Sequence, residues 1–231
     1  MTRSRTLPGF LVTLAIALLL AACGGTTDTS APQATATKGL APTAPPASAA
    51  PALSQGSPDA KVVLATFEDF QCPYCLQYAT QIEPTLIKEY VDTGKIRYEY
   101  HNFVILGTES TKAAIGAYCA GDQGKFWAFH DRLFQVELAA GQLQNEKNNA
   151  GRFTDATLAS MATDLGLDRP VFDTCYAGPE AAQAIKNDAS LASSLKIQGT
   201  PTFTLNGKVV SSPSSIGGWR QLLNQTIAAA Q

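Results

Sequence analysis

The chain has 231 residues, 45% of them hydrophobic and 16% charged, and its formal net charge at pH 7 is -2. This length and apolar content suffice for one sizeable hydrophobic core. The nearly balanced charge, with no basic stripe along any predicted helix, argues against nucleic acid as a partner.

The first residues are typical of an export signal. Arg3 and Arg5 precede the apolar stretch FLVTLAIALLLAA, which has the length of a signal-peptide core and is short for a transmembrane helix, which needs about 20 apolar residues. The stretch runs into Leu20-Ala21-Ala22-Cys23, which resembles a bacterial lipobox. We therefore expect residues 1–22 to be a lipoprotein signal peptide and Cys23 to carry the lipid. An ordinary cleaved signal and an uncleaved anchor are the alternatives.

Residues 23–58 are predicted to be a disordered tether. They consist almost entirely of Ala, Thr, Pro, Ser and Gly, and such a segment buries too little apolar surface to offset the entropy of ordering. The folded part then lies outside the cytoplasm, at the outer face of the cytoplasmic membrane or in the periplasm, where disulfide bonds persist.

The folded domain is expected over residues 59–231. A buried strand is predicted at KVVLATFEDF, and a helix over about 76–90 follows, in which Pro84 is expected to cause a kink or a break. KIRYEYHNF alternates apolar and polar residues, which is typical of a second strand.

The second half of the chain is predicted to be mainly helical. Helices are expected over about 108–196, a hairpin at PTFTLNGKVV with a type I′ turn at Asn206-Gly207, and a final helix over about 218–229. The order strand, helix, strand, helical block, hairpin, helix indicates an α/β fold with an inserted all-helical subdomain.

Five cysteines are present, and four remain if Cys23 carries lipid. Four cysteines allow three pairings, and closeness in sequence favours Cys72 with Cys75, which leaves Cys119 for Cys175 in a structural disulfide. Two alternatives for the latter pair are buried free thiols and a relay that passes electrons to Cys72.

The Cys72 and Cys75 pair follows the first predicted strand, where a helix begins. As the N-cap residue, Cys72 would direct its sulfur at the free N–H groups of the first turn, which favour the thiolate, and Pro73 suits the first helical position. We expect Cys72 to be the exposed attacking sulfur and Cys75 the resolving one.

Two other roles fit this cysteine pair less well. A structural disulfide between such near neighbours closes a very small loop and constrains the unfolded chain little. A zinc site would need two further ligands, but His101 and His130 lie far from the pair and from each other in the sequence. We interpret both histidines as structural or surface residues, and expect no metal and no other cofactor.

The Cys72-Pro73-Tyr74-Cys75 motif, together with GTPTF at 199–203, resembles the DsbA-like thioredoxin-fold family of extracytoplasmic thiol–disulfide oxidoreductases. Further matches are AYCAGDQGKFWAFHDRLF and VFDTCYAG. The resemblance covers the whole predicted domain and implies a thioredoxin fold interrupted by a helical domain. It also implies that the dipeptide Pro73-Tyr74 tunes the reduction potential.

Roles for individual residues follow from this resemblance. Cys72 matches the nucleophile and Cys75 the resolving cysteine. Pro201 matches the cis-proline that lies against the disulfide, and the backbone of Thr200, just before it, can pair with a bound substrate strand.

One position departs from the pattern of many relatives. They carry a buried acid six residues before the first cysteine, where it helps to move the proton of the resolving cysteine, but this chain has Thr66 there. Strand alternation places Glu68 on the same face as Thr66. Glu68 is therefore our hypothesis for proton transfer.

The expected function is that of an extracytoplasmic oxidoreductase that passes its Cys72–Cys75 disulfide to the thiols of secreted proteins. A membrane-bound, quinone-linked oxidase is the implied partner for reoxidation. The alternatives are a reductase or isomerase of disulfides, kept reduced by a membrane thiol donor, and a non-catalytic binding module. Related isomerases usually dimerise through an added N-terminal domain, and this chain has a low-complexity linker there, which argues against an isomerase. We expect a monomer.

Overall fold

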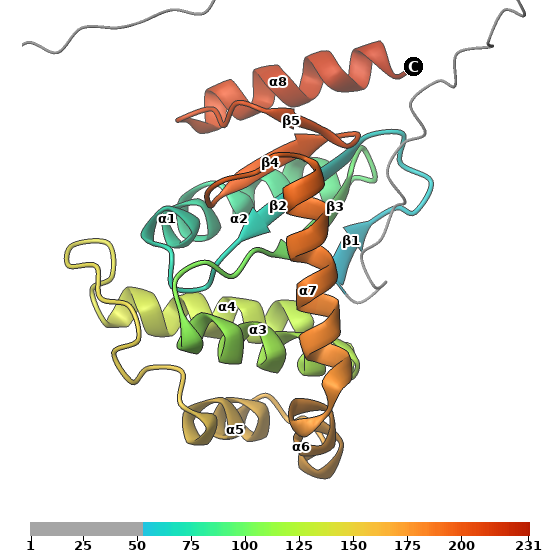
Figure 1. The fold of residues 1–231 in the computed structure, drawn as a ribbon. Helices are drawn as coiled ribbons and strands as arrows, with labels where there is room; N and C mark the ends of the chain where they lie inside the picture. Colours follow the sequence, from blue (N-terminus) through green and yellow to red (C-terminus); the bar gives the residue numbers. More distant parts are fainter. Residues whose placement is uncertain (1–52) are drawn as a thin grey trace, which may run out of the picture. The chain divides into compact units, whose positions relative to one another are not determined.

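A five-stranded mixed sheet lies at the centre of the computed structural model, which describes residues 53–231 (Figure 1). The strands are β1 (Ser54–Gly56), β2 (Val63–Glu68), β3 (Arg97–Asn102), β4 (Thr202–Leu205) and β5 (Lys208–Val210). Their order across the sheet is β1-β3-β2-β4-β5, with β2 and β3 parallel and the remaining neighbours antiparallel. The predicted α/β fold is confirmed.

The helices of the described region are α1 (Pro73–Gln81), α2 (Glu83–Leu86), α3 (Thr108–Gly121), α4 (Phe126–Ala139), α5 (Asp155–Asp164), α6 (Arg169–Ala177), α7 (Pro179–Ser194) and α8 (Ile216–Ala229), with a π-helical turn at Ile87–Val91. The helix expected over 76–90 is broken at Ile82, and Pro84 lies in the first turn of α2. Pro84 has no N–H to donate, so it is tolerated at a helix start and ends the preceding helix.

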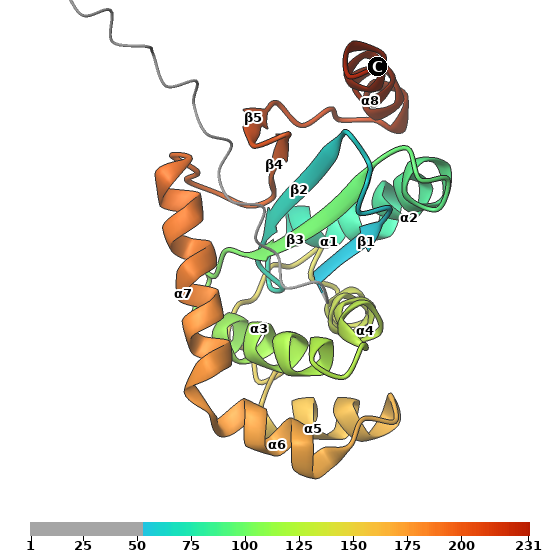
Figure 2. The same ribbon diagram turned by 90° about the vertical axis from the view of Figure 1, so that its right-hand side faces the viewer.

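Helices α3 to α7 follow β3 in sequence and precede β4. Figures 1 and 2 show α3 to α6 stacked beyond one end of the sheet, with α7 running from that stack back alongside the sheet. A disulfide joins Cys119 of α3 to Cys175 of α6. This pair is therefore a cross-link within the helical block and not two free thiols.

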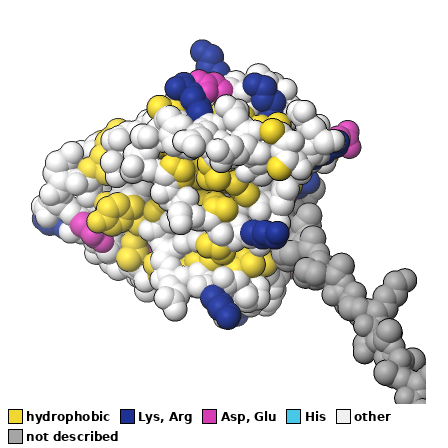
Figure 3. Space-filling view, turned by 90° about the horizontal axis from the view of Figure 1, so that it is seen from above, with side chains coloured by type: hydrophobic (Ala, Val, Ile, Leu, Met, Phe, Trp, Pro, Cys, Tyr) yellow, Lys and Arg dark blue, Asp and Glu magenta, His cyan; other side chains and the backbone are white. Residues whose placement is uncertain are grey.

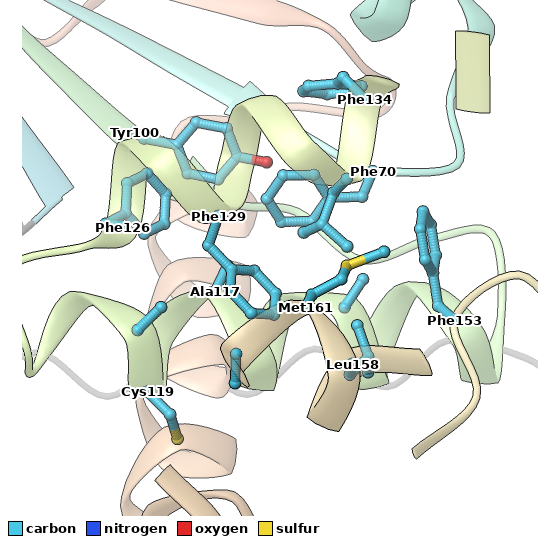
Figure 4. Close-up of a cluster of buried hydrophobic side chains, with 14 of the residues drawn as sticks. Phe70, Tyr100, Ala117, Cys119, Phe126, Phe129, Phe134, Phe153, Leu158 and Met161 are labelled. Atoms are coloured by element: carbon cyan, nitrogen blue, oxygen red, sulfur yellow. The ribbon is translucent and has the colours of Figure 1, made fainter. Parts of the chain in front are cut away.

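Two hydrophobic clusters hold the domain together. The first lies in the helical block and is rich in aromatic rings (Figure 4); its larger members are Phe70, Tyr100, Phe126, Phe129, Phe134, Phe153, Phe172, Leu158 and Met161. The second packs α1, α2 and α8 against the sheet and is built around Tyr78, Tyr98, Phe203 and Trp219. Cys72 and Cys75 belong to the first cluster, so the helical block forms part of their surroundings.

The β4–β5 hairpin turns at the predicted position. Asn206 and Gly207 both have positive φ, 48° and 76°, as a type I′ turn requires. The Asn206 side chain also accepts a hydrogen bond from the Val63 N–H at 2.7 Å, which ties the turn to β2.

The ordered domain begins before the boundary expected at Asp59. Ser54–Gly56 pair with β3, and Leu53 is buried. Gly56 has φ +90°, and a Cβ there would lie 2.6 Å from the Ile96 carbonyl oxygen, so this strand ends where only glycine fits. The strand was missed because the tether composition continues into it.

The predicted signal peptide, Cys23 and most of the predicted tether lie outside the described residues. Over residues 53–231, none of the helices combines the length and apolar character needed to span a membrane.

A buried ion pair connects α7 to the sheet. His101 Nδ1 lies 2.8 Å from Asp188 Oδ1, and the Asn102 N–H donates to Asp188 Oδ2 at 2.9 Å. Burial lowers the pKa of His101, but hydrogen bonds to Asp188 and Glu99 outweigh it and raise the pKa to about 9. The pair therefore stabilises the fold fully below the unfolded-state pKa of about 6.5, and this contribution is lost as pH rises through 9.

We predict that Asp188→Asn lowers the free energy of unfolding by roughly 2 kcal/mol at pH 6. The amide keeps the shape of the carboxylate but removes its charge, so the difference from wild type should shrink above pH 9. Urea unfolding at pH 6 and pH 9.5 measures both values. An equal loss at the two pH values would show that His101 is not charged in the folded protein.

Candidate active site

The two cysteines of the motif lie where β2 leads into α1. Cys72 is the N-cap residue, with extended backbone angles of φ -72° and ψ 122°, and Pro73 occupies the first turn. The Leu76 N–H donates to the Cys72 carbonyl at 3.0 Å, which closes the first helical turn. Cys75 thus lies one turn into the helix, on its buried face.

Cys72 is much less exposed than expected from the sequence. It is 5% exposed and Cys75 0%, so the order of exposure agrees with the expectation, but the description of Cys72 as an exposed sulfur is wrong. The reason is the loop before β4: the Cys72 thiol donates to the Thr200 carbonyl at 3.3 Å. Thr200 is 128 residues further along the chain, and the signal for this contact is not local.

The Thr200–Pro201 peptide bond is cis. Antiparallel pairing of β4 with β2, in which Thr202 lies opposite Phe67, carries this loop to the start of α1. Thr200 and Pro201 are half-buried. A backbone segment with some exposure therefore lies against the sulfur of Cys72.

The surroundings of Cys72 favour its thiolate. A hydrogen bond from the Cys75 thiol lowers the pKa of Cys72 to about 6, although burial opposes the shift. Thr200 and the N–H groups of Cys75 and Tyr74 lower it further. The expected N-cap hydrogen bond to the sulfur is not formed, so the neighbouring thiol is the main cause and the helix start a minor one.

The pKa of Cys75 is shifted in the opposite direction. Burial raises the pKa of its thiol well above the ordinary value, and the hydrogen bond to Cys72 and the nearby Glu68 carboxyl add to the shift. In the reduced pair, the negative charge therefore resides on Cys72 and the proton on Cys75.

Glu68 lies at the end of β2, within reach of Cys75. It is 1% exposed, and burial raises the pKa of its carboxyl to about 8, against the effect of a hydrogen bond from Thr66. That bond, from Thr66 Oγ1 to Glu68 Oε1, is 2.7 Å long, so the two side chains share one face of the strand. Near neutral pH the carboxyl holds a proton beside the Cys75 thiol.

A groove of about 370 Å³ opens next to the cysteine motif, where Tyr74 and the Thr200–Pro201 segment form part of its wall. Its lining residues are uncharged and include Tyr74, Gln77, Thr200, Pro201, Pro213 and Trp219. Tyr74 is 69% exposed. Viewed from above α8, the molecule shows hydrophobic side chains gathered toward the middle of the face and charged ones mainly near its edge (Figure 3).

A family model described as Thioredoxin matches residues 48–225. The chain belongs to the thioredoxin family.

Named relatives within this family agree with the DsbA-like resemblance, which is confirmed. The probable disulfide bond formation protein D of Bacillus anthracis is 28% identical over 162 residues, which cover 68% of this chain and 71% of that protein. Oxidised BdbD of Bacillus subtilis superimposes with a TM-score of 0.66 at 23% identity, covering 76% of this chain and 92% of that one. DsbA of Chlamydia trachomatis gives 0.64 at 18%, covering 81% and 97%.

Sequence reasoning missed the acid that fixes the active-site loop of this thioredoxin domain. Asp69 accepts hydrogen bonds from the N–H groups of Gln71, Ile105 and Leu106 at 2.8–2.9 Å and from the Ser110 hydroxyl at 2.6 Å. It thus ties the segment before Cys72 to the start of the helical block. An acid at the end of a strand, three residues before the cysteine, was the available signal.

Each histidine has neighbours that explain its burial. His101 pairs with Asp188 and His130 is enclosed by aromatic rings. Between Leu53 and the C-terminus, no three His, Cys, Asp or Glu side chains are arranged to hold a metal ion.

We predict that Cys75→Ala raises the pKa of Cys72 from about 6 toward the ordinary cysteine value of about 8.5, because the substitution removes the main hydrogen-bond donor. The pH dependence of iodoacetamide alkylation of Cys72 measures this. Cys75→Ser keeps a donor at the same position and should retain most of the depression. If the alanine and serine variants titrate alike, another group stabilises the thiolate.

Proposed function

We propose that this protein is an extracytoplasmic thiol:disulfide oxidoreductase that transfers its Cys72–Cys75 disulfide to pairs of thiols in secreted proteins. The observation that carries the proposal is the opposite displacement of the two pKa values, down for Cys72 and up for Cys75. The named relatives are disulfide bond formation proteins and disulfide oxidoreductases, which supports the same reaction class.

In the first step, a substrate thiolate attacks the sulfur of Cys72, the more accessible of the two. A substrate–Cys72 disulfide bond forms, the Cys72–Cys75 bond breaks, and Cys75 leaves as a thiolate. A buried thiolate is unfavourable, so Cys75 takes up a proton. Glu68 is the candidate donor, since its carboxyl is protonated near neutral pH and lies within hydrogen-bonding reach.

In the second step, another substrate thiolate attacks the substrate sulfur of the mixed disulfide. The substrate disulfide forms and Cys72 leaves as a thiolate, which its low pKa makes a good leaving group. The substrate has lost two electrons and the cysteine pair has gained them. One proton remains on Cys75 and Cys72 holds the charge.

The stabilised Cys72 thiolate also supports transfer of the disulfide from this protein to its substrates. Anything that stabilises the reduced form of a cysteine pair makes its disulfide a stronger oxidant. The low pKa of Cys72 therefore favours donation of the disulfide over reduction of substrates.

Substrate binding is proposed to use the uncharged groove and the Thr200 backbone. An extended peptide can form main-chain hydrogen bonds beside Cys72 in the manner of an added strand. In the disulfide form, Cys72 has no proton to donate, so the Thr200 carbonyl is then available to a peptide N–H. Main-chain recognition suits an enzyme with many substrate sequences.

We further propose an extracytoplasmic setting for the domain. The lipobox-like Leu20-Ala21-Ala22-Cys23 supports a lipid anchor, and the low-complexity residues that follow, up to the first strand at Ser54, support a tether that holds a monomeric domain near the membrane. A quinone-linked membrane oxidase would then reoxidise the cysteine pair.

The test is oxidative folding of reduced ribonuclease by the oxidised mature protein. We predict that ribonuclease activity returns as the cysteine pair becomes reduced, and that Cys72→Ala and Cys75→Ala each abolish this transfer, because neither variant can form the Cys72–Cys75 disulfide. Thiol trapping follows the redox state of the pair during the reaction. Full transfer by the Cys72→Ala variant would instead support a non-catalytic binding module.

A further inference from the structure

Several polar atoms are buried behind the cysteine pair and have no hydrogen-bond partner of good geometry among residues 53–231, although the Tyr98 hydroxyl interacts with Tyr78 and Glu83. They are Glu68 Oε2, the hydroxyl oxygens of Tyr78, Tyr98 and Tyr100, and His130 Nε2. Each residue is at most 4% exposed. Buried polar groups are normally paired with protein or with ordered water, so a concentration of such atoms next to a reactive site indicates a role.

Glu83, at the start of α2, is the second buried carboxyl of this region. It is 5% exposed, and its Oε2 lies 3.9 Å from His130 Nε2. Burial raises the pKa of Glu83 well above the ordinary value, and the charges of Glu68 and Asp131 raise it further. Burial thus favours the protonated form of Glu83, in which one carboxyl oxygen can give a proton while the other accepts one.

His130, on α4, connects Glu83 to the surface. Its ring is fully buried, and its Nδ1 lies 2.9 Å from Asp131 Oδ1. The Asp131 side chain is 67% exposed. One nitrogen of the ring thus faces the buried carboxyl and the other faces a carboxylate in contact with solvent.

The rings around His130 fix its orientation. They are those of Phe70, Tyr100, Phe126, Trp127 and Phe134, with centroids 4.9–6.1 Å away. Figure 4 shows four of these side chains and the Tyr100 hydroxyl directed into the cluster. A ring held in this way keeps Nε2 directed at Glu83 and Nδ1 directed at Asp131.

Phenol side chains lie close to both buried carboxyls. The charge of Glu68 raises the pKa of Glu83, and the pKa values of Tyr78 and Tyr98 are raised by burial and by both carboxyls. The titratable groups that face Glu83 come from every packed element: Glu68 from β2, Tyr98 from β3, Tyr78 from α1, and His130 and Asp131 from α4.

We propose that Glu83 and His130 form an internal proton relay, completed by ordered water among the three tyrosine hydroxyls, that connects Glu68 with solvent at Asp131. This inference rests on the proposed disulfide transfer and extends it. Glu83 and His130 act on Cys75 only through Glu68, and both are positioning residues for its proton.

The relay works in both halves of the cycle. When the disulfide is reduced by a substrate, Cys75 takes a proton from Glu68, Glu68 takes one from Glu83, His130 gives one from Nε2, and its Nδ1 takes one from solvent beside Asp131. When the oxidase partner re-forms the disulfide, Cys75 loses its proton and each transfer runs backward. One proton enters and one leaves in each cycle, and the ring returns to its starting tautomer.

This arrangement keeps proton exchange away from the substrate. Bound peptide would cover the groove beside Cys72, but Asp131 lies on α4, among residues that do not line that groove. Proton uptake by Cys75 can therefore proceed while the mixed disulfide is in place.

The test is the rate at which excess dithiothreitol reduces the oxidised mature protein, followed by stopped-flow fluorescence from pH 6 to 9 in water and in D2O. We expect Glu83→Gln and His130→Gln each to slow reduction by about tenfold and to increase the solvent isotope effect. Loss of a relay slows reduction and reoxidation of the cysteine pair by the same factor. The equilibrium constant for the exchange of His130→Gln with dithiothreitol should therefore stay within about twofold of the wild-type value at pH 7.

Phe172→Leu is the matched control, because Phe172 is buried in the same aromatic cluster, on α6, and its ring contacts are with Phe129 and Tyr176 and not with His130. It should keep the wild-type rate and isotope effect. The inference is overturned if folded Glu83→Gln and His130→Gln proteins keep both values, or if Phe172→Leu changes them equally. Reduction by dithiothreitol requires no protein substrate, so failure to oxidise ribonuclease would count against the proposed function and leave this result standing.

Discussion

The thiol of Cys75 is completely buried at the start of α1 and directs its hydrogen bond at the sulfur of Cys72. This contact separates the two cysteines chemically, because the proton is held on one and the charge on the other. The leaving-group order, the stability of the reduced pair and the need for a buried proton donor all follow from it. Cys75 is too enclosed to take its proton directly from bulk water, which is why we propose Glu68 as its proton donor.

The rest of the fold holds this contact in place from two sides. Pairing of β2 with β4 brings the cis Thr200–Pro201 peptide against Cys72. From the other side, Asp69 binds the loop before Cys72 to the first turn of the helical block. The helical insertion therefore shapes the site directly, and its aromatic cluster also encloses the His130 ring.

Local sequence patterns predict much of this structure. The strand-to-helix junction at the cysteine motif, the break near Pro84, the hairpin at Asn206-Gly207 and the shared face of Thr66 and Glu68 depend on neighbours in sequence. What could not be predicted depends on distant segments: the burial of Cys72 under residue 200, the strand before Asp59, and the approach of Glu83 to His130. Periodicity contains no information about which distant residues meet.

The reduction potential of the Cys72–Cys75 pair tests the central claim most directly. The oxidised mature protein would be equilibrated with glutathione buffers of defined ratio, and its free thiols trapped and counted. Stabilisation of the Cys72 thiolate predicts a strongly oxidising reduction potential, about -120 mV, as in the most oxidising enzymes of this class. A value near about -270 mV would contradict the account, since the pair would then act as a reductant.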